Sequence, residues 1–148
     1  MKAVLQRVDQ ASVTVDDQII GQIKIGLVIL LGIKTGDTEA DLEWLADKCL
    51  QLRIFEDENG KFNKSLLDVG GSVLVISQFT LFADCRRGRR PSFTDAAPPE
   101  FANAMYEKFV RYVRNHSVPV ETGKFAAHMI VHIQNNGPVT ITIDTEDR

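Results

Sequence analysis

Asn135-Asn136-Gly137-Pro138-Val139-Thr140 interrupts a long alternating pattern near the end of the chain. Apolar residues occupy every second position in residues 129–134 and again in residues 139–144, which is the period of a half-buried β-strand. Asn-Asn-Gly between them is turn chemistry, because Asn and Gly tolerate positive φ, and Pro138 suits the first position of a strand. The pattern predicts two strands and leaves two interpretations of their link open. The link is either an ordinary hairpin turn or a cis Gly137–Pro138 peptide that presents bare backbone to a ligand, since an X–Pro bond becomes cis at a cost of roughly 0.5–1 kcal/mol.

Segments upstream of this stretch supply further strands. Residues 3–8 and 11–15 are two short β-rich runs, and residues 19–25 are expected to return as the partner of a hairpin. Residues 27–33 are apolar on both faces, which predicts a central strand. Residues 72–82 are predicted to form a second long strand whose first half is buried.

Two stretches have the period of an amphipathic helix. Thr38 is predicted to cap a helix with apolar residues at i, i+3, i+4, i+7 and i+8. This stripe is Leu42, Leu45, Ala46, Cys49 and Leu50. Pro98-Pro99-Glu100 opens a second helix, because proline suits the first turn. Its expected buried face is Phe101, Met105, Phe109, Tyr112 and Val113. The order of strands, helix, strand, helix and strands predicts a mixed α/β fold in a single domain, residues 1–148.

Composition excludes several function classes. Seventeen basic and twenty acidic residues give a net charge of −3, so any contact with RNA must come from a local patch. The two cysteines, Cys49 and Cys85, make neither a disulfide framework nor a zinc set. His128 and His132 would lie about 13 Å apart on a strand, so no metal or other cofactor is expected. The chain has no signal-peptide pattern, and its longest apolar run, Leu27 to Leu31, is too short to span a bilayer. A cytoplasmic location is expected.

Two polar motifs carry the candidate chemistry. Ser77-Gln78-Phe79-Thr80-Leu81 places polar side chains in an otherwise buried strand, where they must find partners, either neighbouring backbone or a ligand. Thr80 is a candidate nucleophile, but a threonine hydroxyl needs an adjacent base and the sequence indicates none. The basic loop 86–90 contains four arginines, which form either a solvated face or a phosphate-binding patch.

Taken together, these motifs resemble those of the D-aminoacyl-tRNA deacylases, the D-tyrosyl-tRNA deacylase family. The resemblance rests on Ser77 to Leu81 and on Asn136 to Thr140. It extends to residues 3–8, to Arg90-Pro91-Ser92-Phe93 and to residues 125–129, and so covers nearly the whole chain. It implies a largely antiparallel, barrel-like sheet with two main helices.

The resemblance also implies a function and a site. The chain would be an editing hydrolase that cleaves the ester between a D-amino acid and the 3′-terminal adenosine of tRNA, and that also removes glycine mischarged on alanine tRNA. It would work as a homodimer with active sites at the interface, where a cis Gly137–Pro138 from one subunit enters the pocket of the other and rejects L-amino acids. Ser77, Gln78, Phe79 and Thr80 would line the catalytic pocket. Phe125 and Met129 would help form the adenine pocket, and Arg7 would brace the Gly-Pro loop.

Elementary chemistry is compatible with these roles. An aminoacyl ester is already activated, so backbone amides near Phe79 and Thr80 can hold the developing oxyanion. The 2′-hydroxyl of the tRNA can position or activate water, which would explain the missing base. RNA has this hydroxyl and DNA does not, so DNA is not expected as a partner. The short apolar runs give no reason to expect a membrane as a partner either. Two alternatives stay open: a non-catalytic RNA-binding module that uses the arginine loop, and an esterase with Thr80 as its nucleophile.

Overall fold

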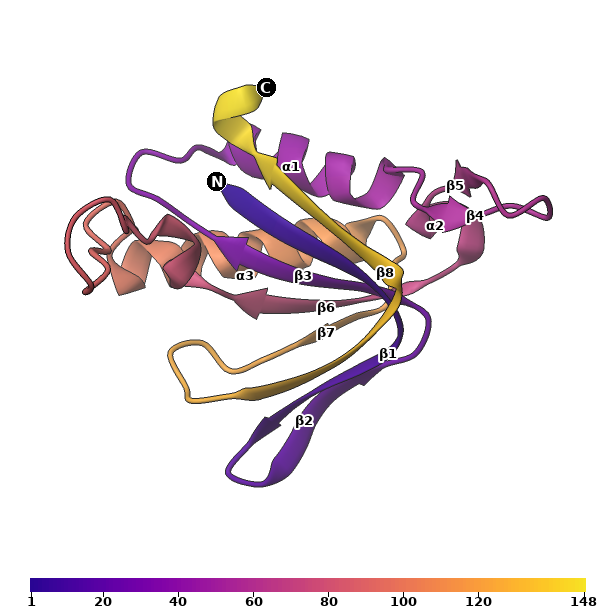
Figure 1. Ribbon diagram of the computed structural model, residues 1–148, viewed down its shortest axis with the longest axis horizontal. Helices are drawn as coiled ribbons and strands as arrows, with labels where there is room; N and C mark the ends of the chain where they lie inside the picture. The colour runs from indigo at the N-terminus through magenta and orange to yellow at the C-terminus, as the bar shows by residue number, and fades with distance from the viewer.

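The computed structural model describes residues 1–148 and is organised around one bent sheet (Figure 1). Its strands are β1 (Lys2–Val15), β2 (Gln18–Ile23), β3 (Gly26–Gly32), β6 (Ser72–Ser77), β7 (Val120–Thr122) and β8 (Ile130–Asp144). The strand order is β2-β1-β3-β6-β7, and β8 also pairs with β1. β1 is antiparallel to β2, β3 and β8, whereas β6 is parallel to β3 and β7. The predicted mixed, largely antiparallel sheet is therefore confirmed.

The sheet is nearly closed into a barrel because β1 changes partner along its length. Residues 2–8 of β1 pair with β3 and residues 11–15 pair with β2, while β8 follows both halves on the other side. In Figure 1 the two halves of the sheet diverge from the bend in β1. At the far side β2 approaches β7, since a Cβ built on Gly21 would lie 2.8 Å from the carbonyl oxygen of Thr122. The two β-rich runs predicted at the N-terminus are thus one long bent strand.

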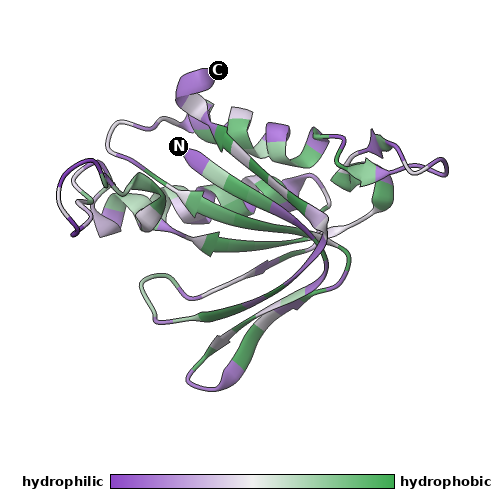
Figure 2. Cartoon of the chain, viewed as in Figure 1, coloured by the Kyte–Doolittle hydropathy of each residue, from purple (hydrophilic) through white to green (hydrophobic).

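Two main helices cover one face of the sheet, as expected (Figure 1). They are α1 (Glu39–Gln51) and α3 (Pro99–Asn115), and the shorter elements are α2 (Leu66–Val69), β4 (Phe55–Glu56), β5 (Phe62–Lys64) and the 3-10 turns η1 (Phe79–Phe82) and η2 (Thr145–Asp147). No helix has the length and hydropathy needed to cross a membrane. In Figure 2, β3 and β6 are hydrophobic along most of their length, and they contribute to the core of 27 buried residues that also includes the inner faces of α1 and α3.

The helix predictions are confirmed for α1 and partly wrong for α3. The Thr38 hydroxyl accepts the backbone N–H of Asp41 at 3.3 Å, and the five predicted stripe residues of α1 are buried. The buried residues of α3 are Ala102, Met105, Tyr106, Phe109, Val110 and Val113. Phe101 is exposed and Tyr112 is half-buried, because the helix turns the face that begins at Ala102 toward the core.

The link at the Asn-Asn-Gly-Pro stretch is not a hairpin turn. Residues 130–144 form the single strand β8, which runs antiparallel to β1 on both sides of the motif. Thr140 pairs with Gln6 and Asn135 pairs with Val8, so four residues of β8 stand opposite Arg7 alone. The excess residues loop out of the ladder, and the Gly137–Pro138 peptide within them is cis. The peptide has the cis geometry of the second interpretation, and presentation of this backbone to a ligand stays a prediction.

The predicted strand over residues 72–82 is also too long. β6 ends at Ser77, and residues 79–82 form the 3-10 turn η1. The ladder ends because the N–H of Gln78 makes a last bond to the carbonyl of Leu31 at 2.8 Å, after which Gln78 turns the chain with φ −140° and ψ 77°. The polar motif therefore lies on a turn at the end of a buried strand.

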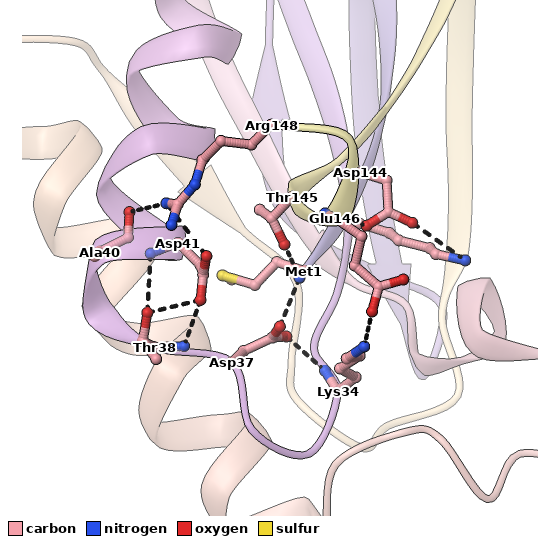
Figure 3. Close-up of polar contacts among 11 residues, drawn as sticks. Met1, Lys34, Asp37, Thr38, Ala40, Asp41, Asp144, Thr145, Glu146 and Arg148 are labelled. Atoms are coloured by element: carbon pink, nitrogen blue, oxygen red, sulfur yellow. Dashed lines mark hydrogen bonds and ion pairs between the residues drawn. The ribbon is translucent and has the colours of Figure 1, made fainter.

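The two ends of the chain are joined by a buried polar cluster (Figure 3). The α-ammonium group of Met1 donates to Asp37 Oδ1 at 2.6 Å and also to the hydroxyl of Thr145. Asp37 Oδ2 accepts the backbone N–H of Lys34 at 2.7 Å. The cluster fixes the segment that leaves β3 and enters α1, and so helps to hold α1 against the sheet.

Candidate active site

A cavity of about 730 Å³ opens where β6 ends, α3 begins and the chain returns toward β8. Its lining is mostly apolar with a few polar groups, which is the usual character of a small-molecule site. The lining residues are Ile33, Ile76, Ser77, Gln78, Phe79, Phe93, Ala96, Ala97, Pro98, Pro99, Ala102, Phe125, Ala126, Ala127, His128, Met129 and Val131. Five of the nine candidate site residues line this cavity, namely Ser77, Gln78, Phe79, Phe125 and Met129, whereas Thr80, Arg7, Gly137 and Pro138 do not.

The Ser-Gln-Phe-Thr motif turns sharply at the edge of this cavity. The first intrahelical bond of η1 runs from the N–H of Leu81 to the carbonyl of Gln78 at 3.3 Å, so the amides of Phe79 and Thr80 precede it and have no partner inside the turn. The Gln78 side-chain amide donates to the Thr80 hydroxyl. An amide is not a base, so this contact does not activate Thr80 as a nucleophile.

Phe125 and Met129 come from the loop between β7 and β8, and Phe125 is supported from behind by α3. The Phe125 ring lies 6.1 Å from the ring of Tyr106, centroid to centroid. The Tyr106 hydroxyl donates to the carbonyl of Val75 at 2.8 Å, and burial raises the pKa of this phenol to about 12. Tyr106 is thus a neutral, fixed support that joins the cavity wall to β6.

The Gly137–Pro138 loop lies outside this cavity within one chain. Both residues are exposed, and neither they nor Arg7 line the cavity. Asn135 bridges the base of the loop: its Oδ1 accepts the N–H of Val139 at 2.8 Å and its Nδ2 donates to the Thr140 hydroxyl at 3.0 Å.

Arg7 holds the other side of the loop. Its side chain is only 7 % exposed, and its Nε donates to the carbonyl of Asn136 at 3.0 Å. Nη1 donates to the carbonyl of Ile54 at 2.8 Å, and Nη2 lies 3.5 Å from a carboxylate oxygen of Glu56. The guanidinium group therefore ties the loop to the segment that follows α1.

Gly137 allows the loop to pack closely on Arg7. Its φ is 131°, which L side chains rarely adopt. A Cβ at this position would lie 2.8 Å from Cγ2 of Val139 and 3.0 Å from Nη2 of Arg7. Any side chain here would displace the loop or its support.

The basic loop after η1 is exposed and partly neutralised. Arg86 donates to the carboxylate of Asp84 through Nε and Nη2, both at 2.8 Å, and these bonds lower the pKa of Asp84 to about 2. Arg87, Arg89 and Arg90 take part in none of the ion pairs of the chain. Three cations of this loop therefore face solvent.

Sequence patterns missed several contributors to the cavity. Phe93 lines the cavity but belongs to a motif for which the sequence predicts no role. Tyr106 lies outside the predicted face of α3 and contributes by supporting Phe125 in the cavity wall. Tyr106 continues the i, i+3, i+4 spacing from Ala102, so a shift of that face by one residue would have found it. No group of three or more His, Cys, Asp or Glu residues is arranged to hold a metal ion.

Comparisons with known proteins match this chain over nearly its whole length to a single family. The family described as D-Tyr-tRNA(Tyr) deacylase matches residues 4–144. The D-aminoacyl-tRNA deacylase of Thermotoga petrophila is 58 % identical over 145 residues, which is 98 % of this chain and 97 % of the relative. That of Clostridioides difficile is 56 % identical over the same shares of the two chains.

Two solved structures share the fold. One, named "c-Myc DNA Unwinding Element Binding Protein", has a TM-score of 0.93 and 46 % identity over 97 % of this chain and 98 % of its own. The other, a probable eukaryotic D-amino acid tRNA deacylase, has a TM-score of 0.84 over 96 % of this chain and 97 % of its own. Because its sequence is only 18 % identical, this match supports the fold and nothing further. The extent of the sequence match, together with the barrel-like sheet, shows that this chain belongs to the D-Tyr-tRNA(Tyr) deacylase family.

Proposed function

We propose that this protein is an editing enzyme that hydrolyses D-aminoacyl-tRNA to free D-amino acid and tRNA in the cytoplasm. The observation that carries the proposal is the end-to-end match to relatives named D-aminoacyl-tRNA deacylase. An apolar cavity with a polar turn at its edge suits a nucleoside ester, because the base needs an apolar pocket and the ester needs hydrogen-bond donors.

In this proposal the terminal adenosine enters the cavity. Phe125 and Met129 contact the adenine, and Ser77 and Gln78 lie near the ribose and the ester. The backbone amides of Phe79 and Thr80 stabilise the oxyanion that develops when water attacks the ester carbonyl. The 2′-hydroxyl of the terminal ribose positions that water, so the protein needs no general base and no metal ion.

Chiral selection requires a second copy of the chain. Gly137 and Pro138 do not line the cavity of their own subunit, yet they project from β8 on a loop that Arg7 and Asn135 hold at both ends. We propose a homodimer in which this loop enters the partner's cavity, with the carbonyls of Gly137 and Pro138 occupying the space of an L side chain. Glycine has no Cβ and would not clash with these carbonyls, so the proposed enzyme would also remove glycine mischarged on alanine tRNA.

The decisive experiment compares D-tyrosyl-tRNA with L-tyrosyl-tRNA, each incubated with purified protein in buffer that contains a metal chelator. Release of D-Tyr with the L-ester left intact is the expected result. Binding of the tRNA without hydrolysis would favour the RNA-binding module instead, and an acyl group trapped on Thr80 would favour the nucleophilic esterase. A DNA hairpin of the same sequence serves as a competitor, because one relative of similar fold is named for binding a DNA element; it should compete poorly.

A further inference from the structure

Two phenylalanine rings that line the cavity are also exposed to solvent. Phe79 is 55 % exposed and Phe93 is 37 % exposed. Their ring centroids are 5.1 Å apart with an interplanar angle of 70°, which is an edge-to-face pair. Such a pair leaves ring surface free to receive another planar group. Neither the adenine pocket nor the oxyanion site of the proposed function uses these exposed rings.

The position of Phe93 is fixed by backbone hydrogen bonds. Asp84 and Ser92 exchange two backbone bonds, at 2.7 and 3.0 Å, which close the base of the arginine loop directly before Phe93. The carbonyl of Phe93 accepts the N–H of Ala96 at 3.1 Å. The Phe93 side of the pair therefore has a fixed backbone at the exposed edge of the cavity.

Unpaired cations lie in the chain segment that leads to Phe93. Arg90 is three residues from Phe93, a separation of roughly 11 Å at most, and Arg87 and Arg89 belong to the same exposed loop. This loop connects η1 to the start of α3 (Figure 1), and Figure 2 shows it as hydrophilic. Exposed aromatic rings next to arginines are the combination that binds single-stranded nucleic acid, because bases stack on the rings and phosphates pair with the cations.

We propose that Phe79 and Phe93 form a stacking platform for the nucleotide that precedes the terminal adenosine. The base of that nucleotide lies on the phenylalanine pair, and the phosphates next to it lie against Arg87, Arg89 and Arg90. This inference rests on the proposed function, which places the terminal adenosine in the adjoining cavity. Stacking accepts any base, since every base has a π-face, so the platform extends affinity along the single-stranded end without selecting a sequence.

The test measures binding of short RNA oligonucleotides whose terminal adenosine carries D-Tyr through a 3′-amide, which is not hydrolysed. One oligonucleotide is intact, and the other lacks only the base next to the terminal adenosine. Wild-type protein should bind the abasic oligonucleotide about tenfold more weakly, within the range that stacking of one base supplies. In Phe93→Leu this difference should fall to about threefold or less, because one of the two rings that receive the base is missing and only Phe79 remains. Phe93→Tyr, which keeps an aromatic ring, should restore it.

Phe101→Leu is the matched control, because Phe101 is another exposed phenylalanine but does not line the cavity. It should keep the wild-type difference. Equal affinity of wild-type protein for the two oligonucleotides would overturn the proposal. So would a tenfold difference that persists in Phe93→Leu with an unchanged melting temperature, or failure of wild-type protein to bind the intact oligonucleotide. Hydrolysis of the two oligonucleotides that carry D-Tyr through an ester is measured separately. If the affinity difference depends on Phe93 as expected but neither ester is cleaved, the stacking platform is supported and the proposed deacylation is refuted.

Discussion

Replacing Arg7 by methionine should destabilise the protein and release the Gly137–Pro138 loop. The buried guanidinium group donates to two carbonyls, those of Asn136 and Ile54, at 3.0 and 2.8 Å. Hydrogen bonds that involve a charged group contribute about 1.5–3 kcal/mol each, but the substitution also removes the cost of burying a charge. We therefore expect a net loss of about 2–4 kcal/mol in the free energy of unfolding.

Urea denaturation measures this loss. With a slope of about 1–3 kcal/mol per molar urea for a small protein, the midpoint should fall by roughly 1 M or more while the slope stays constant. Glu56→Gln is the matched control: the Glu56 carboxylate lies 3.5 Å from Arg7 and is 53 % exposed, and such a pair contributes about 0–1 kcal/mol. Arg7→Lys keeps the charge but not the planar fork, so its midpoint should lie between those of Arg7→Met and wild type.

The functional part of the same prediction concerns chirality. Arg7→Met is assayed without urea, at a temperature where the variant is fully folded. It should hydrolyse D-tyrosyl-tRNA at least tenfold more slowly than wild type, or it should begin to hydrolyse the L-ester. If Arg7→Met keeps both the wild-type midpoint and the wild-type ratio of D to L hydrolysis, Arg7 does not position the loop and the bracing argument is wrong.

Three further predictions concern the loop, the nucleophile and the arginines. Gly137→Ala should lose most D-ester hydrolysis or discrimination, because its Cβ would meet Val139 and Arg7; Gly60→Ala, which also has positive φ but nothing within 4 Å of the new Cβ, should keep both. Thr80→Val should retain at least about a third of wild-type kcat, because the substitution leaves the backbone amide in place. By contrast, D-aminoacyl-tRNA with a 2′-deoxy terminal ribose should react at least tenfold more slowly. Abolition of turnover by Thr80→Val would contradict the amide mechanism. Replacing the four arginines of residues 86–90 by alanine should weaken tRNA binding. Arg86 is already paired with Asp84, so three phosphate contacts should be lost, and at about 0.7 each for a single strand the slope of log Kd against log salt should fall by about 2. An unchanged slope would leave this loop as solvated surface.

The sequence was most informative where local pattern and burial agree. The buried stripe of α1 and the strand β3, which is apolar on both faces, could be predicted because the spacing of apolar residues along each segment indicates which faces are buried. The polar motif Ser77 to Thr80 was predicted on one strand, but the strand ends at Ser77 and residues 79–82 form a 3-10 turn. No local sequence signal distinguishes a continuing strand from the turn that follows the last bond to Leu31. The path of β8 could not be predicted, because both a hairpin and a looped-out strand have alternating flanks. Only the register with β1 distinguishes them, and register is a long-range property.

The division of the candidate residues into two groups limits how one chain can select a substrate. The cavity holds Ser77, Gln78, Phe79, Phe125 and Met129, whereas Gly137 and Pro138 project elsewhere on the same subunit. A pocket for adenosine and an ester does not by itself distinguish D from L, because both enantiomers present the same nucleoside and the same carbonyl. Under the proposed mechanism, the carbonyls of Gly137 and Pro138 occupy the space that the side chain of an L-amino acid would need, so the L-ester is excluded. Side-chain walls can change rotamer, but the backbone of this loop is held at its two ends: Arg7 donates to the carbonyl of Asn136, and the Asn135 side chain accepts the N–H of Val139. Selectivity would then depend on two conditions, dimerisation and the integrity of these bonds, and a variant that remains dimeric but lacks the Arg7 contacts should separate them.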